Sequence, residues 1–248
     1  GTQECFIHQL KDMKEALPGY DYIGVGRDDG KEKGEHSAIF YRTDKFDVIE
    51  KGDFWLSETP DVPSKGWDAV LPRICSWGHF KCKDTGFEFL FFNLHMDHIG
   101  KKARVESAFL VQDKMKELGK GKELPAILTG DFNVDQTHQS YDAFVSKGVL
   151  CDSYEKAGFR YAINGTFNNF DPNSFTESRI DHIFVSPSFQ VKRYGVLTDT
   201  YRSIVGKGEK KQANDCPEEI DIKTYQARTP SDHFPVKVEL EFDQRQQK

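Results

Sequence analysis

Four short polar motifs, far apart in the 248-residue chain, contain residue types that could act together on a phosphate group. Carboxylates can hold a cation or accept a proton from water, whereas imidazole and amide groups can donate hydrogen bonds to phosphoryl oxygens. Polar residues at the ends of apolar strands are expected to converge, because active sites are built from loops on a rigid sheet. The motifs are "QE" at 3–4, "NLHMDH" at 93–98, "GDFN" at 130–133 and "SDHFP" at 231–235.

The third motif follows the apolar run "AILTG" and presents Asp131 and Asn133 with one aromatic residue between them. Residues i and i+2 of an extended segment point to the same side, so this pair could hold one water molecule or one metal-bound oxygen. The alternative is a turn in which each side chain caps backbone N–H groups. The tetrapeptide alone leaves both interpretations open.

The fourth motif places Asp232 and His233 between Pro230 and Pro235, in a short stiff loop suited to holding a catalytic imidazole. A histidine exposed to solvent is the alternative. Asp181 lies in the apolar stretch "RIDHIFVS" and needs a partner, because an unpaired buried charge is costly. A protonated His233 would be suitable, held by the carboxylate as other catalytic histidines are.

The second motif places His95 at the end of a Phe-rich stretch, followed by His98 and a basic run that includes Arg104. Such cations near a helix N-terminus can attract a phosphate, although a basic run at a helix start is more commonly a solvated surface. Glu4, considered alone, is typical of an exposed residue near a helix start.

Strands and helices must position these motifs. The residues Ala108, Val111, Met115 and Leu118 recur at helical spacing, and a second helix is predicted over 5–17. Helices alternating with strands favour a layered α/β fold over a barrel or a bundle. The predicted strands are 37–42, 87–95, 126–131, 179–186 and 235–242, the last alternating as expected for one solvated face.

The composition is that of a globular protein, with 37% hydrophobic and 30% charged residues. No repeat or long linker divides the chain, so we expect one domain over 1–243, with a polar insertion at 206–219 and a polar tail at 244–248. The net charge of −6 argues against a broad basic surface for duplex nucleic acid. The five cysteines fit neither a zinc motif nor a complete disulfide framework, and we expect mostly buried thiols.

No apolar run approaches the roughly 18 residues that span a bilayer, so we expect no transmembrane segment. We expect a monomer, and the sequence does not indicate a compartment.

In this order, "QE", "NLH", "GDFN", "RIDHIF" and "SDHFP" resemble the endonuclease/exonuclease/phosphatase superfamily over nearly the whole chain. The stretches "GVGRDDG" and "GEHSAIFYR" look like uncharacterised bacterial members. The resemblance implies a deoxyribonuclease I-like, four-layer α/β/β/α sandwich of two packed mixed sheets flanked by helices. It also implies a divalent cation, Mg²⁺ or alternatively Mn²⁺. Family members begin with a strand that ends in a metal-binding Asn, so the resemblance implies that the first strand and helix are missing here.

The resemblance also implies roles for the motif residues. Glu4 matches the metal-binding glutamate and Asp232 matches the carboxylate beside the metal. Asp131 and Asn133 match the pair that aligns the attacking water and contacts the phosphate.

Three further residues match the family's proton-transfer and phosphate contacts. His95 matches a histidine that donates to a phosphate oxygen, and His233 matches one that contacts the phosphoryl oxygen or assists proton transfer. Asp181 matches the carboxylate that orients His233. His98 and Arg104 are further candidates for phosphate or substrate contacts.

The hypothesis is therefore divalent-metal-dependent hydrolysis of a phosphoester by in-line attack of an activated water. The first alternatives are an endo- or exonuclease on DNA or RNA and a sphingomyelinase-like lipid phosphodiesterase. An alternative from another class is a non-catalytic protein that binds an anionic ligand on the same fold. The partner is then a small-molecule phosphoester, a lipid headgroup or a nucleic acid.

Overall fold

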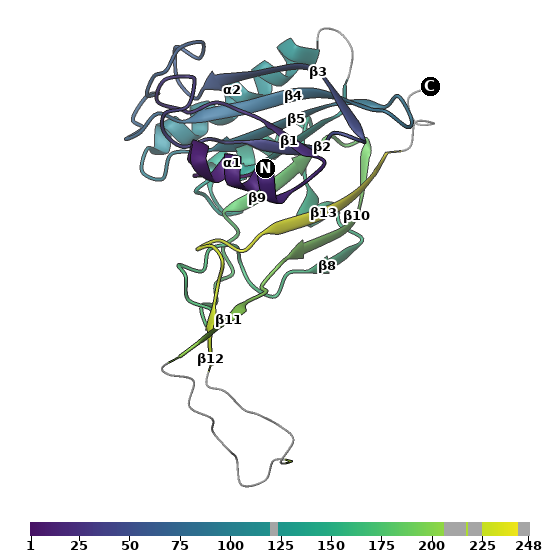
Figure 1. Cartoon of the computed structure of the whole chain (residues 1–248). Helices are drawn as coiled ribbons and strands as arrows, with labels where there is room; N and C mark the ends of the chain where they lie inside the picture. The colour runs from purple at the N-terminus through teal and green to yellow at the C-terminus, as the bar shows by residue number, and fades with distance from the viewer. Residues whose placement is uncertain (120–123, 206–216, 218–224, 243–248) are drawn as a thin grey trace.

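A six-stranded mixed sheet is the larger of two packed sheets in the computed structural model, which describes residues 1–119, 124–205, 217 and 225–242 (Figure 1). Strands β5 and β6 are parallel, and every other pair in this sheet is antiparallel. Helix α2 (Lys101–Gly119) makes the crossover that two parallel strands require. The spatial order is β3 (Phe46–Trp55), β4 (Ile74–Cys82), β5 (Glu88–His95), β6 (Ala126–Asp131), β9 (Asp181–Val185) and β7 (Cys151–Asp152).

The second sheet has the order β13 (Val236–Phe242), β10 (Phe189–Val196) and β8 (Phe159–Tyr161). It packs on the first through an apolar cluster that joins residues of β5, β6, β9, β10 and β13. Phe87 and Phe242 meet there with ring centroids 4.2 Å apart. Strand β13 alternates as predicted, with apolar side chains partly buried and Lys237 exposed.

Helices cover the other face of the large sheet. The apolar residues of α2 and α3 (Gln139–Val145) share one core with β5, β6 and β9. In α2, the helical spacing seen in the sequence places these residues on one face. Phe132, Phe144 and Phe184 interlock at its centre, with ring centroids 5.1 to 5.3 Å apart. Asp152 precedes the short helix α4 (Ser153–Lys156) and caps it by accepting a hydrogen bond from the Tyr154 N–H.

Smaller elements complete the described fold. Helix α1 (Ile7–Ala16) precedes the antiparallel pair β1 (Tyr20–Ile23) and β2 (Ile39–Arg42). The hairpin of β11 (Tyr201–Ile204) and β12 (Tyr225–Arg228) projects from the rest of the molecule in Figure 1.

The predicted α/β fold with two packed mixed sheets flanked by helices is confirmed, and each predicted strand and helix is present. Among the described cysteines all four are free thiols, but only Cys75 is buried, so the expectation of mostly buried thiols was wrong. No described helix has the length and apolar character that a membrane crossing requires. Most of the expected insertion and the expected tail at 244–248 lie outside the described residues.

Candidate active site

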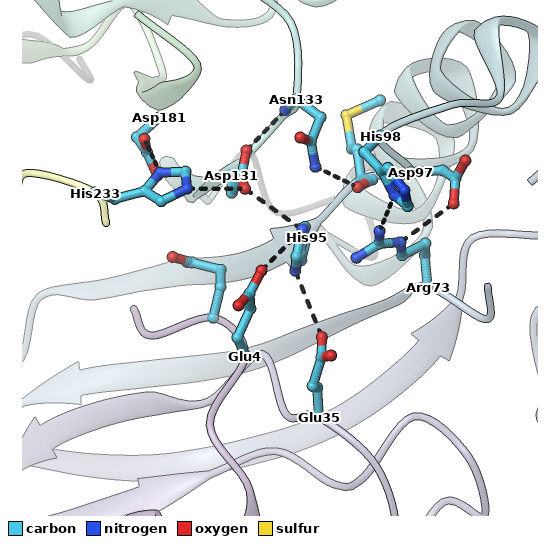
Figure 2. Close-up of polar contacts among 12 residues, drawn as sticks. Glu4, Glu35, Arg73, His95, Asp97, His98, Asp131, Asn133, Asp181 and His233 are labelled. Carbon is cyan, nitrogen blue, oxygen red and sulfur yellow. Dashed lines mark hydrogen bonds and ion pairs between the residues drawn. The ribbon is translucent and has the colours of Figure 1, made fainter. Parts of the chain in front are cut away.

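Three predicted site residues form one row across three neighbouring strands. His95 is paired with Asp131, and Asp131 is paired with Asp181. Residues directly opposite each other on neighbouring strands present their side chains on the same face. Because β5 and β6 end at this edge of the sheet and β9 begins there, the row lies where the loops converge (Figure 2).

Asp131 uses its two carboxylate oxygens differently. Oδ1 accepts a hydrogen bond from the Asn133 N–H at 2.8 Å. Oδ2 lies 3.4 Å from Nε2 of His95 and 3.9 Å from Nε2 of His233. The turn interpretation of "GDFN" therefore holds for Asp131, whose other oxygen faces the two imidazoles, whereas the Asn133 side chain caps no N–H group and its backbone is not extended. Burial raises the pKa of Asp131 to about 7, and the nearby charge of Asp181 also raises it.

The backbone at the end of β6 and just after it explains why Gly130 and Asn133 are found there. A Cβ atom at Gly130 would lie 2.4 Å from the carbonyl oxygen of Leu94, so the close approach of the neighbouring strand requires glycine. Asn133 has a φ of 51°, a left-handed conformation that Asn tolerates better than most residues. Its Nδ2 donates to the Met96 carbonyl at 2.9 Å, which fixes the amide at the edge of the site.

His233 is held by Asp181, as predicted. Its Nδ1 lies 2.8 Å from Oδ2 of Asp181. Burial alone would lower the pKa of His233, but the hydrogen bond and charge of Asp181, with the charges of Asp131 and Asp232, raise it to about 9. The imidazole is therefore protonated at neutral pH, and its Nε2 is directed toward Asp131.

His95 has the opposite electrostatic character. Burial lowers its pKa well below the usual range, and the positive charges of Arg73 and Arg27 lower it further. Its Nε2 lies 4.0 Å from Oε1 of Glu4, and its Nδ1 lies 3.9 Å from Oε2 of Glu35. The site therefore contains one neutral and one protonated imidazole, both beside Asp131.

Two buried arginines that the sequence did not single out also belong to the site. The Nε of Arg73 lies 3.4 Å from Oδ1 of Asp97, and its Nη2 lies 3.0 Å from Nδ1 of His98. Its Nη1 is buried and has no hydrogen-bond partner among the described residues. Arg27 lies 2.6 Å from Glu35. The chain offers only weak signals for them, since Arg27 lies in the stretch "GVGRDDG" and Arg73 follows Pro72 directly before an apolar strand.

These side chains surround a pocket of about 390 Å³, a size typical of small-molecule sites. Asp181 lies behind His233 and does not line the pocket. Arg104 does not reach it either, since its Nη1 donates to the Asp97 carbonyl at 2.9 Å and only 6% of the residue is exposed. The lining residues are Glu4, Arg27, Glu35, Leu71, Arg73, His95, His98, Asp131, Asn133, Phe167, Ile180, Asp232 and His233.

The carboxylates around Glu4 fit a hard divalent cation. A smaller cavity of about 110 Å³ is lined by four of them: Glu4, Asp131, Asp181 and Asp232. Burial raises the pKa of Glu4, and the negative charges of Glu35 and Asp232 raise it further, so a cation would relieve this repulsion. Oxygen ligands are those that Mg²⁺ prefers.

Glu35 is a further candidate ligand that the sequence did not indicate. Glu4, Glu35 and His95 offer ligand atoms within 4.8 Å of one another, and this set shares Glu4 with the predicted pair of Glu4 and Asp232. Glu35 lies before β2, in the stretch "GEHSAIFYR", for which the sequence suggested a family resemblance but no role.

Comparisons with known proteins show similarity over nearly the whole chain. The model of the Endonuclease/Exonuclease/phosphatase family matches residues 1–233. An uncharacterised protein of Acanthamoeba polyphaga mimivirus is 31% identical over 96% of this chain and 84% of its own length.

Two solved bacterial structures are similar over nearly the whole chain. A mannosyl-6-phosphatase of Bacteroides thetaiotaomicron is 86% identical with a TM-score of 0.90, over 98% of this chain and 84% of that chain. An endonuclease/exonuclease/phosphatase protein of Bacteroides vulgatus is 38% identical with a TM-score of 0.81, over 97% and 83% respectively.

Proposed function

The chain belongs to the endonuclease/exonuclease/phosphatase family, and on that premise we propose that it is a divalent-metal-dependent phosphatase of sugar 6-phosphates. The observation that carries this proposal is the pairing of a base and an acid in one pocket. Oδ2 of Asp131 lies 3.9 Å from Nε2 of the protonated His233, and the buried guanidinium of Arg73 lines the same pocket. Such a pocket can activate water and stabilise a phosphoryl group together.

Asp131 is the proposed base. Its Oδ1 is held by the Asn133 N–H, so Oδ2 is left to orient a water molecule and to accept its proton. The water then attacks phosphorus in line with the leaving oxygen of the sugar.

His233 and His95 are the proposed donors to the phosphoryl oxygens. His233 carries a positive charge and is oriented by Asp181, whereas the neutral His95 donates one N–H. Asn133 has a second amide hydrogen available besides the one bonded to Met96. Arg73 adds positive charge where the phosphate carries negative charge.

Glu4 and Asp232 are the proposed metal ligands, with Glu35 as a further candidate. A Mg²⁺ ion bound there, or Mn²⁺ in its place, would stabilise negative charge on the phosphate and on the leaving oxygen. The four carboxylates around the small cavity support this location. Family enzymes are generally dependent on a divalent metal.

The substrate class rests on similarity and on charge. The mannosyl-6-phosphatase of Bacteroides thetaiotaomicron is 86% identical, which favours a mannosyl 6-phosphate here and supports a bacterial origin. The net charge of −6 disfavours a nuclease that tracks a long polyanion. No described feature favours a sphingomyelinase-like activity.

The test is release of inorganic phosphate from mannose 6-phosphate by the purified chain with Mg²⁺. Bis-p-nitrophenyl phosphate, plasmid DNA, short RNA, inositol phosphates and sphingomyelin form the comparison panel, and Asp131→Asn is the inactive control. We expect turnover on the sugar phosphate to exceed that on every other substrate. Faster cleavage of DNA or RNA would replace the proposal with a nuclease. Binding of mannose 6-phosphate without turnover under any divalent metal would indicate a non-catalytic binding protein.

A further inference from the structure

Phe167 lines the pocket and is exposed, although its two neighbours in the chain are buried. Phe167 is 41% exposed, whereas its neighbours Thr166 and Asn168 are 0% and 1% exposed. Because both neighbours of Phe167 are buried, the segment that carries this exposed ring is packed against the rest of the protein.

Hydrogen bonds fix this segment to the loop of the catalytic histidine. The Asn168 N–H donates to the Asp232 carbonyl at 2.7 Å, and the Phe234 N–H donates to the Thr166 carbonyl at 2.7 Å. Phe167 also forms an isolated β-bridge with His233. The two rings lie edge to face, with centroids 5.2 Å apart and an interplanar angle of 71°. Phe167 therefore has a fixed position relative to the phosphate-binding end of the pocket.

The pocket separates polar from apolar groups. Its charged residues come from the strand ends and the buried arginines, whereas its apolar lining consists of Leu71, Phe167 and Ile180. Leu71 is 40% exposed and Phe167 is 41% exposed, so both of these apolar side chains are available to a ligand. A sugar phosphate has a matching distribution, because its phosphate is strongly polar and one face of a pyranose ring presents mainly C–H groups.

We propose that Phe167 is the platform on which the pyranose ring of the substrate lies while its phosphate occupies the polar end of the pocket. This inference rests on the proposed function and adds the residue that selects a ring-shaped leaving group. An aromatic face buries apolar C–H surface and has the negative charge distribution that attracts C–H hydrogens.

A nucleotide base could also stack on an exposed aromatic ring, but the segment that carries Phe167 has no basic run for a polynucleotide. The segment 159–178 has three charged residues, which are Arg160, Asp171 and Glu177. Arg179, which follows it, is buried against Asp152. A nucleic-acid site would require a basic track along the backbone.

The test compares three substrates that differ only in what carries the phosphate: mannose 6-phosphate, acyclic glycerol 3-phosphate and adenosine 5′-monophosphate. We expect Phe167→Ala to lower the ratio of kcat/KM for mannose 6-phosphate to that for glycerol 3-phosphate by about tenfold, mainly through KM. Phe167→Tyr, which keeps the aromatic ring, should have the same ratio as the unmutated chain. Phe175→Ala is the matched control, because Phe175 is 70% exposed in the same segment but does not line the pocket.

A binding measurement separates recognition from turnover. In the Asp131→Asn background, Phe167→Ala should weaken binding of mannose 6-phosphate about tenfold by calorimetry while weakening binding of inorganic phosphate less. An unchanged substrate ratio and unchanged affinity in Phe167→Ala would overturn the platform, and a larger loss for the nucleotide would assign it to a base. If the unmutated chain hydrolyses glycerol 3-phosphate but not mannose 6-phosphate, the proposed function fails instead.

Discussion

Oδ2 of Asp131 lies 3.4 Å from His95 and 3.9 Å from His233, so a single carboxylate oxygen faces one neutral and one protonated imidazole. The two histidines differ because Asp181 contacts only one of them. His95 instead lies buried beside two arginines, whose charges disfavour a second cation. The same residue type therefore supplies two different donors to one pocket.

The pKa values of Asp131 and His233 predict a bell-shaped pH dependence of kcat/KM. Asp131 must be ionised to act as a base, so activity should rise as the pH rises through its pKa of about 7. A bound cation lowers that pKa, so the acid limb lies at about 7 or below. His233 must be protonated, so activity should fall as the pH rises through about 9 or, with the cation bound beside Asp232, through a lower value. Initial rates at low substrate concentration between pH 5 and 10 measure both limbs.

Asp181→Asn should move the alkaline limb most, and the acid limb should also move to lower pH because the charge of Asp181 raises the pKa of Asp131. Loss of the carboxylate at 2.8 Å removes the main cause of the raised pKa of His233, so the limb should shift to lower pH by roughly one to two units. A uniform loss of activity with an unmoved alkaline limb would show that Asp181 has only a structural role.

Asp131→Asn should lower kcat by a hundredfold or more, because the amide is isosteric but cannot accept the proton of the water. The Asn133 N–H can still donate to the amide oxygen, so the turn after β6 should persist. Circular dichroism and the melting temperature check that the turn persists.

His233→Ala should lower kcat by a similar factor, because the charge that stabilises the phosphoryl oxygens is lost. Near-normal turnover in either purified variant would contradict the assigned role.

Glu4→Gln should weaken metal binding more than it weakens binding of phosphate. Glu4 has an unfavourable charge environment that a cation would relieve, so the neutral amide removes both a ligand and the repulsion. Calorimetric titration of the chelator-treated chain with Mn²⁺ should show at least a tenfold lower affinity in this variant. Glu35→Gln, measured in the same way, tests whether Glu35 is a ligand. Equal affinities in Glu4→Gln and the unmutated chain would rule out the proposed metal location.

Arg73→Ala should lower both stability and phosphate affinity. Arg73 and Asp97 form a buried ion pair with side chains 4% and 1% exposed, and removing one partner of such a pair costs about 3 kcal/mol. That loss corresponds to a fall in Tm of roughly 6–12 °C for a chain of this size. Thermal unfolding of the purified variant measures this fall in Tm. Asp97→Asn serves as the comparison, because it weakens the ion pair but leaves the guanidinium in the pocket. If Asp97→Asn impaired phosphate binding as strongly as Arg73→Ala, the effect of Arg73 would be structural.

The strands that end in motif residues could be predicted because each is a short apolar run followed at once by polar groups. Strand β3 was not predicted, since its centre reads "EKGD", a pattern typical of a loop, and it tolerates those residues because it is an edge strand with one neighbour. Strand β10 was also missed, because a register shift between Val191 and Arg193 interrupts its alternation.

The motif residues of the site could likewise be predicted, but Arg27, Glu35 and Arg73 could not. Arg27 and Glu35 lie in stretches that suggested a family resemblance but no role, and Arg73 has only its position before an apolar strand. All three reach the pocket only through tertiary contacts that bring loops beside β2 and β4 to the strand ends. Arg104 shows the reverse error: a basic residue after a motif, where the sequence suggested a phosphate contact, is buried against the backbone of Asp97 instead.

The row of His95, Asp131 and Asp181 lies on paired strands, whereas Phe167 and Leu71 belong to connecting segments. Ladder hydrogen bonds fix the spacing of the row, and one residue inserted into β6 would turn Asp131 to the opposite face. Loops, by contrast, tolerate exchange and insertion. In descendants of this chain, the leaving group can therefore change by substitution in the loops while the reaction itself is inherited unaltered.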